Sequence, residues 1–447
     1  MFWTTWLVES WKRKESVIAH KWLMRDFQDS TTERKDFRAV LDVDVQTKRK
    51  WMQSVRNTYL RTLLVGIPVS LFFIACVVAV QVVQRMWRIR NDEVYGVADG
   101  GKVPLHIKYI PSVCNSAAIT IFGAIYKQVA LWLVNNENHR QTHDYEDSLI
   151  NKIYQFQFIN AYISTYLFAY WIQDFYNASY NLVIVIVGIQ FGNNLFEWFS
   201  DAFGTQRKIN KVRAKYEKKV ENAKDMPGKE GELERADIEL AQFCEEQMVM
   251  KTEKGEQFVW FYNEQFVQLG FIAFFAFVFP PAPLFSLITN FLEIRVKLNS
   301  MTYYSKRNPS LGASGIGSWL PIMELISMIC IPINVAIIYF TGYIGEKSVF
   351  VQYLQGKNEE ALADGADVIW TNENIIWLLI LLEHAILGLK IIISVLIPDV
   401  PQAILFEEFR EEQIGSMAKK EIQVFKIITK SENFEDSLSR LQDEARD

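Results

Sequence analysis

Long apolar stretches recur along this chain of 447 residues, and they restrict its fold more than any other feature. A helix needs about 20 mostly apolar residues to cross the hydrocarbon core of a bilayer. Eight stretches meet this requirement: 60–86, 112–135, 153–174, 181–200, 258–279, 282–302, 317–341 and 374–397. Since helices satisfy their own backbone hydrogen bonds in lipid, the sequence predicts an all-α, polytopic membrane helix bundle with about eight transmembrane helices.

The segments between these spans are rich in charged residues, and their sign predicts the orientation of the bundle. Residues 201–256 contain the basic block QRKINKVRAKYEKK, whereas 342–373 are mostly acidic. Loops rich in Lys and Arg stay in the cytosol, so both termini and the 201–256 segment are expected there. Four basic residues in the loop 87–111, which this orientation places outside, argue against it.

This orientation divides the chain into five regions. They are a cytosolic helical segment (1–59), four transmembrane helices with a groove (60–200), a cytosolic charged helical linker (201–256), four further transmembrane helices (257–398) and a cytosolic C-terminal tail (399–447).

Composition and motifs argue against several other classes of protein. The formal net charge of −5 gives no basis for nucleic-acid binding. The four cysteines form neither a CxxC pair nor a Cys/His cluster, so they predict no disulfide framework and no zinc site. HExxH, nucleophile-elbow and kinase motifs are all missing from the sequence, which therefore gives no support for an enzyme.

Carboxylates and an amide lie inside three of the apolar spans, near their predicted cytosolic ends. Asn193 and Glu197 are four residues apart, and so are Glu293 and Lys297, which puts each pair on one face of a helix. Glu264 lies near the start of the 258–279 span. Carboxylate and amide oxygens are ligands of calcium. The alternative is that each carboxylate forms a local ion pair or reaches the membrane interface; Lys297, one turn from Glu293, is then expected to neutralise it.

Longer motifs resemble the anoctamin family of calcium-activated chloride channels and lipid scramblases. NNLFE (193–197), ENHRQTHDYEDSLINKIYQFQFINAY (137–162), QLGFIAFFAFVFPPAPLFSLITNFLEIR (268–295) and IPDVP (397–401) carry this resemblance, which runs through nearly the whole chain in order. It implies a homodimer with ten transmembrane helices per subunit and a groove open to lipid. It also implies that the family's N-terminal cytosolic domain and first two membrane helices are absent here, because the chain is truncated or split or its sequence is partial. The ENHR…YEDSL form is most similar to the intracellular-membrane and fungal branch, which implies the endoplasmic reticulum or another intracellular membrane.

The resemblance also gives the polar residues of the spans a role. The family holds calcium with an Asn and a Glu on its sixth helix, two Glu on its seventh, and a Glu and an Asp on its eighth. Four of these ligands are matched, by Asn193, Glu197, Glu264 and Glu293. Phe261 and Lys297 stand in place of the other two acids. The resemblance therefore implies a degenerate site in which a fixed ammonium opposes Ca²⁺.

Polar residues in the second and third spans are candidates for the groove lining, because a crossing headgroup needs polar groups in place of water. The resemblance to the anoctamins implies that this groove lies between the spans 60–86 and 258–279. The candidate residues are Asn115, Ser116, Thr120, Asn160, Tyr162, Ser164, Thr165 and Tyr166. The alternative for each is an interhelical hydrogen bond without a part in transport. Gly188 and Gly192 could let the 181–200 span bend as a gating hinge, or could serve close helix packing.

Together these features predict an integral membrane protein that scrambles phospholipids or conducts ions such as chloride, with degenerate calcium control. Phospholipids and a second copy of the chain, or a larger membrane complex, are its expected partners. The alternative is a transport-inactive structural or regulatory subunit of a membrane complex.

Overall fold

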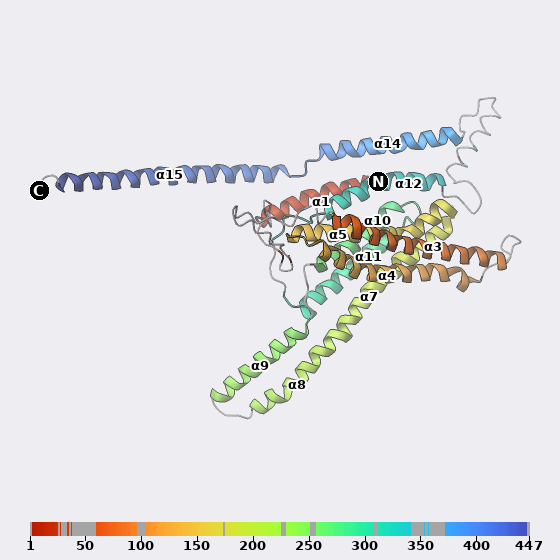
Figure 1. Cartoon of the computed structure of the whole chain (residues 1–447), viewed down its shortest axis with the longest axis horizontal. Coiled ribbons are helices and arrows are strands. Elements are labelled where there is room, and N and C mark those ends of the chain that lie inside the picture. The colour runs from red at the N-terminus through yellow and green to blue at the C-terminus, as the bar shows by residue number, and fades with distance from the viewer. Residues whose placement is uncertain are drawn as a thin grey trace.

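The computed structural model describes residues 2–25, 27, 34, 37, 60–95, 104–172, 175–224, 229–250, 256–307, 312–340, 353, 356 and 372–444. The secondary structure of these residues is helical and includes no strand. This confirms the predicted all-α membrane helix bundle (Figure 1).

Helices lie at all eight predicted spans, and several are extended by π-helical turns (η). The helices and turns of the spans are η1 (Thr62–Gly66) with α3 (Ile67–Val94), α4 (Leu105–Glu137), α5 (Thr142–Tyr166) with η3 (Leu167–Ile172), α6 (Phe175–Val185) with η4 (Ile186–Phe191) and α7 (Gly192–Phe199), α10 (Glu256–Phe274), α11 (Ala282–Asn299) with η6 (Ser300–Tyr304), α12 (Trp319–Phe340) and α14 (Asn372–Leu396). Outside the spans lie α1 (Phe2–Lys21), η5 (Ser200–Thr205), α8 (Gln206–Lys224), α9 (Lys229–Val249) and α15 (Gln402–Glu444).

Five helices in the described part of the chain are long and apolar enough to cross a membrane. They cover Thr62–Val94, Ile110–Glu137, Ala178–Glu217, Trp319–Phe340 and Glu373–Leu396. The other three predicted spans form α5, α10 and α11 but are not among them. The reason for α5 is visible in its packing: it lies against α3, α4, α6 and α10, and its buried positions include polar ones such as Asn160 and Ser164. Helices enclosed by other helices need less apolar surface than helices that face lipid.

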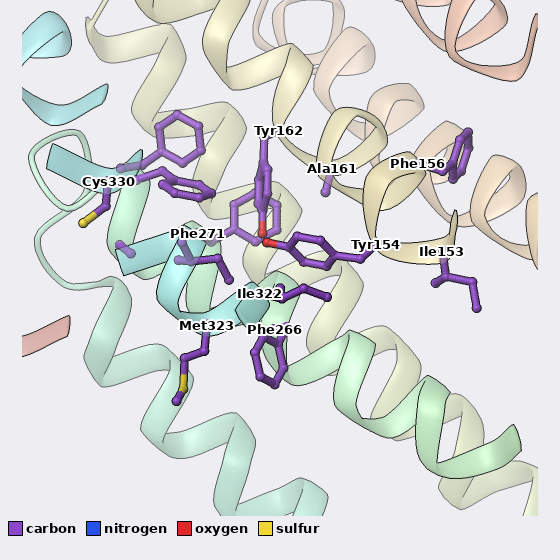
Figure 2. Packing of buried hydrophobic residues seen from close by; sticks show 14 of the residues in the cluster. Ile153, Tyr154, Phe156, Ala161, Tyr162, Phe266, Phe271, Ile322, Met323 and Cys330 are labelled. Carbon is purple, nitrogen blue, oxygen red and sulfur yellow. The ribbon is translucent and has the colours of Figure 1, made fainter. Parts of the chain in front are cut away.

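Aromatic side chains of α5 and α10 form the centre of the core, as Figure 2 shows around Tyr162 and Phe271. The ring of Tyr162 is fully buried and lies edge-on to those of Phe271 and Phe274, at 4.9 and 5.3 Å between centroids. Its hydroxyl donates a hydrogen bond to the carbonyl oxygen of Val267 over 2.8 Å. Gly270 leaves room for this phenol, because a methyl group there would overlap it. The α5–α10 contact is therefore closely packed.

The charged helices extend from one end of the bundle. Figure 1 shows α8 and α9, which pack on each other, and the long α15 reaching beyond the same end. The C-terminal ends of α3 and α12 and the N-terminal ends of α4 and α14 lie at the opposite end. The predicted orientation requires this arrangement, since it puts 201–256 and the C-terminal tail on one side and 342–373 on the other. Which end faces the cytosol, and hence the division into five regions, stays a prediction.

Helix α1 lies along the bundle. Lys12 Nζ is 2.7 Å from Glu324 Oε1 of α12, and the Ser394 hydroxyl of α14 donates a hydrogen bond to Glu9 Oε1 over 2.8 Å. Part of the predicted cytosolic segment 1–59 is thus packed against two apolar spans. Residues 38–59 of that segment lie outside the described residues.

Candidate functional site

Three helices bring the predicted metal residues together. α11 packs on both α7 and α10. The amide of Asn193 on α7 donates to Glu264 Oε1 on α10 over 3.4 Å. Glu293 on α11 is buried and accepts a hydrogen bond of 2.6 Å from the amide of Gln265 on α10. Residues 71 and 100 positions apart in the sequence therefore share one polar site, which the i,i+4 spacings within α7 and α11 make possible.

An ammonium group occupies the side of this site between α7 and α11. Lys297 Nζ lies 2.9 Å from Glu197 Oε2, and the two side chains are only 17% and 23% exposed. The same ammonium lies over the ring of Phe261, 4.0 Å from its centroid. The two residues that depart from the family's ligand pattern thus contact each other, and the quadrupole of the ring stabilises the cation. The i,i+4 spacing predicted Glu293 as the partner of Lys297. In the structure, Lys297 instead forms its hydrogen-bonded ion pair with Glu197.

This arrangement does not fit a calcium ion. Calcium takes six to eight oxygen ligands, whereas Lys297 has no acceptor and Phe261 has no oxygen in its side chain. The ammonium already donates to Glu197, and at a few ångströms it would repel a divalent cation strongly in a medium of low dielectric constant. Among the described residues, no group of three or more His, Cys, Asp or Glu side chains is placed to hold a metal ion.

Three of the predicted groove residues are joined in a buried polar cluster. The amide of Asn115 on α4 donates to Ser164 Oγ on α5 over 2.9 Å and to Asn181 Oδ1 on α6 over 3.3 Å. Asn181 in turn donates to Ser164 and to Thr165 Oγ1, over 3.1 and 3.3 Å. Gln81 on α3 donates to Asn115 Oδ1 over 2.6 Å. Four helices are therefore connected through neutral amides and hydroxyls.

The other predicted groove residues do not share one surface. Asn160 is buried and donates to the carbonyl oxygen of Ile119, and Tyr162 belongs to the aromatic core. The ring of Tyr166 stacks on Tyr170, with 5.9 Å between centroids. Ser116 and Thr120 lie one turn apart on α4, and the Thr120 side chain is exposed and bonded to the Ser116 carbonyl. That these eight side chains line a transport path stays a prediction.

The two candidate hinge glycines have different surroundings. Gly188 lies in the π-helical turn η4, where a methyl group would come 3.1 Å from Ser116 Oγ of α4. Gly192 begins α7, and a methyl group there would meet no atom within 4 Å. The geometry favours close helix packing as the reason for Gly188. Gly192 follows a π-helical turn, a feature common at functional sites, and its hinge role stays a prediction.

Several residues of these clusters were not predicted from the sequence. Gln81 and Asn181 complete the polar cluster around Asn115, and Gln265 holds Glu293. A signal existed for Gln81, because it is a polar residue in the apolar run IACVVAVQVV. Glu137 was also missed: its buried carboxylate is held by Thr62, His139, Ser148 and Lys152 at 2.7–3.0 Å.

The helical bundle, with its apolar spans and its polar side chains enclosed between helices, defines a polytopic membrane protein. The family model described as "Anoctamin: Calcium-activated chloride channel" matches residues 1–411. The chain belongs to the anoctamin family.

Curated relatives match the chain over most of its length. Anoctamin-10 of Homo sapiens is 27% identical over 441 residues, which are 96% of this chain and 60% of the relative. Anoctamin-10 of Mus musculus is 25% identical over 414 residues, 90% of this chain and 56% of the relative. Anoctamin-7 of Mus musculus is 23% identical over 483 residues, which cover 94% of this chain and 53% of the relative. The chain therefore spans 53–60% of the length of these relatives.

Proposed function

We propose that this anoctamin family member moves phospholipids or ions across a membrane and that Lys297 does the work of the activating calcium ion. The observation that carries the proposal is the 2.9 Å contact between the Lys297 ammonium and Glu197. It joins α11 to α7 by a positive charge that belongs to the chain. A cation supplied by the chain is present at every calcium concentration, so transport is expected to proceed without calcium.

The carboxylates of the site need a positive charge close to them. Glu197, Glu264 and Glu293 converge from three helices, and like charges at low dielectric constant repel each other. In a calcium-activated protein the ion removes this repulsion and draws the helices together. Here the Lys297 ammonium supplies one positive charge. The neutral Phe261 beside it stands in place of a Glu, so the site has one negative charge fewer at that position. The reduced number of acids matches the reduced charge of the cation.

A second candidate function is that of a structural or regulatory subunit without transport. The buried polar cluster around Asn115 favours it, because each of its side chains has a hydrogen-bond partner inside the bundle. Under either function we propose a homodimer or a larger membrane complex, cytosolic placement of 201–256 and the C-terminal tail, and an intracellular membrane such as the endoplasmic reticulum. The ENHR…YEDSL motif supports the last of these.

Reconstitution separates the two candidates. The purified chain is placed in liposomes that contain a fluorescent phospholipid, and a membrane-impermeant quencher is added outside, with either calcium or a chelator in the buffer. Transport predicts that the inner-leaflet fluorescence is also lost, at equal rates in both buffers. Chloride efflux from the same liposomes tests the ion-channel form.

Each result has one meaning. Activity only with calcium refutes the role of Lys297 and leaves the transport function standing. Liposomes that show neither lipid nor chloride movement in either buffer refute transport. Co-purification of unrelated subunits in fixed amounts would then support the structural role.

A further inference from the structure

Helix α9 carries an apolar stripe on the face turned away from α8. Leu240, Phe243 and Met248 are 61%, 59% and 77% exposed, and Cys244 between them is exposed as well. Because residues three, four and eight positions apart lie on one side of a helix, these four side chains form one surface, here called the α9 stripe. Glu246, on the other side of the helix, is buried against α8.

Lipid does not cover the α9 stripe in the predicted orientation. α9 belongs to the charged helix pair that extends from one end of the bundle (Figure 1), and it is not one of the apolar spans found in the described residues. Apolar side chains that are exposed together and rimmed by polar residues mark an interaction surface. The exposed side chains of Asp237 and Glu239 flank the N-terminal end of the stripe. The surface therefore suits a partner that is both apolar and basic.

Residues 45–59, VQTKRKWMQSVRNTY, have this chemistry and lie outside the described residues. Trp51, Val55 and Tyr59 recur at every fourth position of this segment. Apolar residues at that spacing are the anchors with which an amphipathic peptide binds an apolar surface. The segment also contains four Lys or Arg residues and no Asp or Glu. It therefore complements both the apolar side chains and the carboxylates of α9.

The length of the segment allows it to reach the α9 stripe. Arg61, just beyond its end, donates a hydrogen bond to the carbonyl oxygen of Asn136 at the end of α4, over 2.7 Å. Lys127 Nζ, further back on α4, lies 4.1 Å from the ring centroid of Trp260 on α10, the helix that follows α9. The helix between Lys127 and Asn136 is about 14 Å long. An extended segment of 15 residues spans roughly 50 Å, so chain length permits the contact.

We propose that residues 45–59 bind the α9 stripe of the same chain. The aromatic and aliphatic residues of the segment cover the stripe, and its basic residues lie beside Asp237 and Glu239. This contact joins the part of the chain that precedes α3 to the helix pair between α7 and α10, two helices that contribute to the carboxylate site. The contact does not require lipid or ion transport.

Fluorescence quenching by Trp51 tests the proposal on the full chain. The four native cysteines are replaced by Ser, and Ala241→Cys, at the exposed margin of the stripe, is labelled with bimane, a fluorophore that tryptophan quenches on contact. We expect the fluorescence to rise several-fold when Trp51→Leu is added. Trp377→Leu removes an exposed tryptophan of α14 and should leave the fluorescence unchanged. Fluorescence that does not change with Trp51→Leu overturns the proposal.

A second set of variants tests whether the stripe itself provides the surface. Leu240→Gln with Met248→Gln should raise the fluorescence to the level of Trp51→Leu, because two exposed apolar side chains are lost from the stripe. Leu405→Gln with Phe409→Gln makes the same kind of change at exposed positions of α15 and should leave the quenching intact. Quenching that survives the loss of Leu240 and Met248 would show that Trp51 does not bind the stripe, which overturns the proposal.

Co-expression distinguishes binding within one chain from binding between two copies. The Ala241→Cys chain with Trp51→Leu is purified together with an excess of cysteine-free chain that keeps Trp51, and the mixture is labelled with bimane. Fluorescence that stays high supports binding within one chain. Fluorescence that falls to the quenched level would assign the segment to a second copy and overturn the same-chain contact.

Discussion

Replacing Lys297 by Met isolates the contribution of its charge. Met keeps a long unbranched side chain that can still lie on the Phe261 ring, so the main loss is the ammonium. Two unit charges at the 2.9 Å separation of Lys297 Nζ and Glu197 Oε2 attract each other by about 6 kcal/mol at an effective dielectric constant of about 20. Desolvation of both groups offsets much of that attraction.

The loss in free energy of unfolding depends on how exposed the Lys297–Glu197 pair is. Removing one partner of a fully buried pair costs about 3–5 kcal/mol, and an exposed pair contributes about 0–1 kcal/mol. With 17% and 23% of the side chains exposed, Glu197 regains part of its hydration in the variant. We expect Lys297→Met to lower the free energy of unfolding by about 2 kcal/mol, between these two limits.

Denaturant titration in mixed micelles, with a chelator present, measures this difference. Arg295→Met is the matched control, because it removes the same charge two residues away on α11 from a residue that is exposed. We expect Arg295→Met to change the free energy of unfolding by less than about 0.5 kcal/mol. If the two variants lose the same stability, or if Lys297→Met loses none, the ammonium does not hold α7 against α11 and the reasoning is wrong.

Two further predictions concern the core and the charged helix pair. Gly270→Ala should lower the free energy of unfolding by about 1–3 kcal/mol, because the methyl group overlaps the phenol of Tyr162; unchanged stability in the same titration would contradict the described packing. Burial alone would raise the pKa of Glu246, but hydrogen bonds from Arg213 and Gln242 outweigh it and lower this pKa below its ordinary value of 4.5. The contribution of Glu246 to the α8–α9 contact is therefore present above pH 4.5 and lost as the pH falls through the lowered pKa. The distance between spin labels on α8 and α9 should widen in that acid range, and Glu246→Gln should weaken this pH dependence; a distance that stays constant in the unsubstituted chain would refute this.

The bundle was predictable from the sequence because lipid imposes a length and a composition on every helix that faces it. The spans 60–86, 317–341 and 374–397 show this, since α3, α12 and α14 lie there and meet the apolar criterion. α5 was also predicted as a helix, but whether its polar side chains are tolerated depends on the helices α3, α4, α6 and α10 that enclose them. Enclosure is a tertiary property that no local pattern contains.

The sequence could predict which site residues share a face of one helix, but not which side chains of different helices contact each other. The i,i+4 spacing correctly puts Glu293 and Lys297 on one face of α11, yet the hydrogen-bonded partner of Lys297 is Glu197, 100 positions away on α7. That choice depends on how α7 approaches α11. Likewise, the groove residues Asn115 and Ser164 were recognised as unusual polar residues, but their mutual hydrogen bond needs the packing of α4 on α5.

Calcium binding tests the central claim most directly, namely that Lys297 stands where an anoctamin would bind calcium. Binding of calcium to the purified chain and to Lys297→Asp is measured by equilibrium titration, with Arg295→Asp as the matched control. In the unsubstituted chain and in Arg295→Asp, we expect no saturable calcium binding that depends on Glu197. In Lys297→Asp we expect saturable calcium binding, and adding Glu197→Gln to that variant should abolish it. Saturable binding in the unsubstituted chain that Glu197→Gln removes, or a Lys297→Asp variant that binds no calcium, would contradict the account.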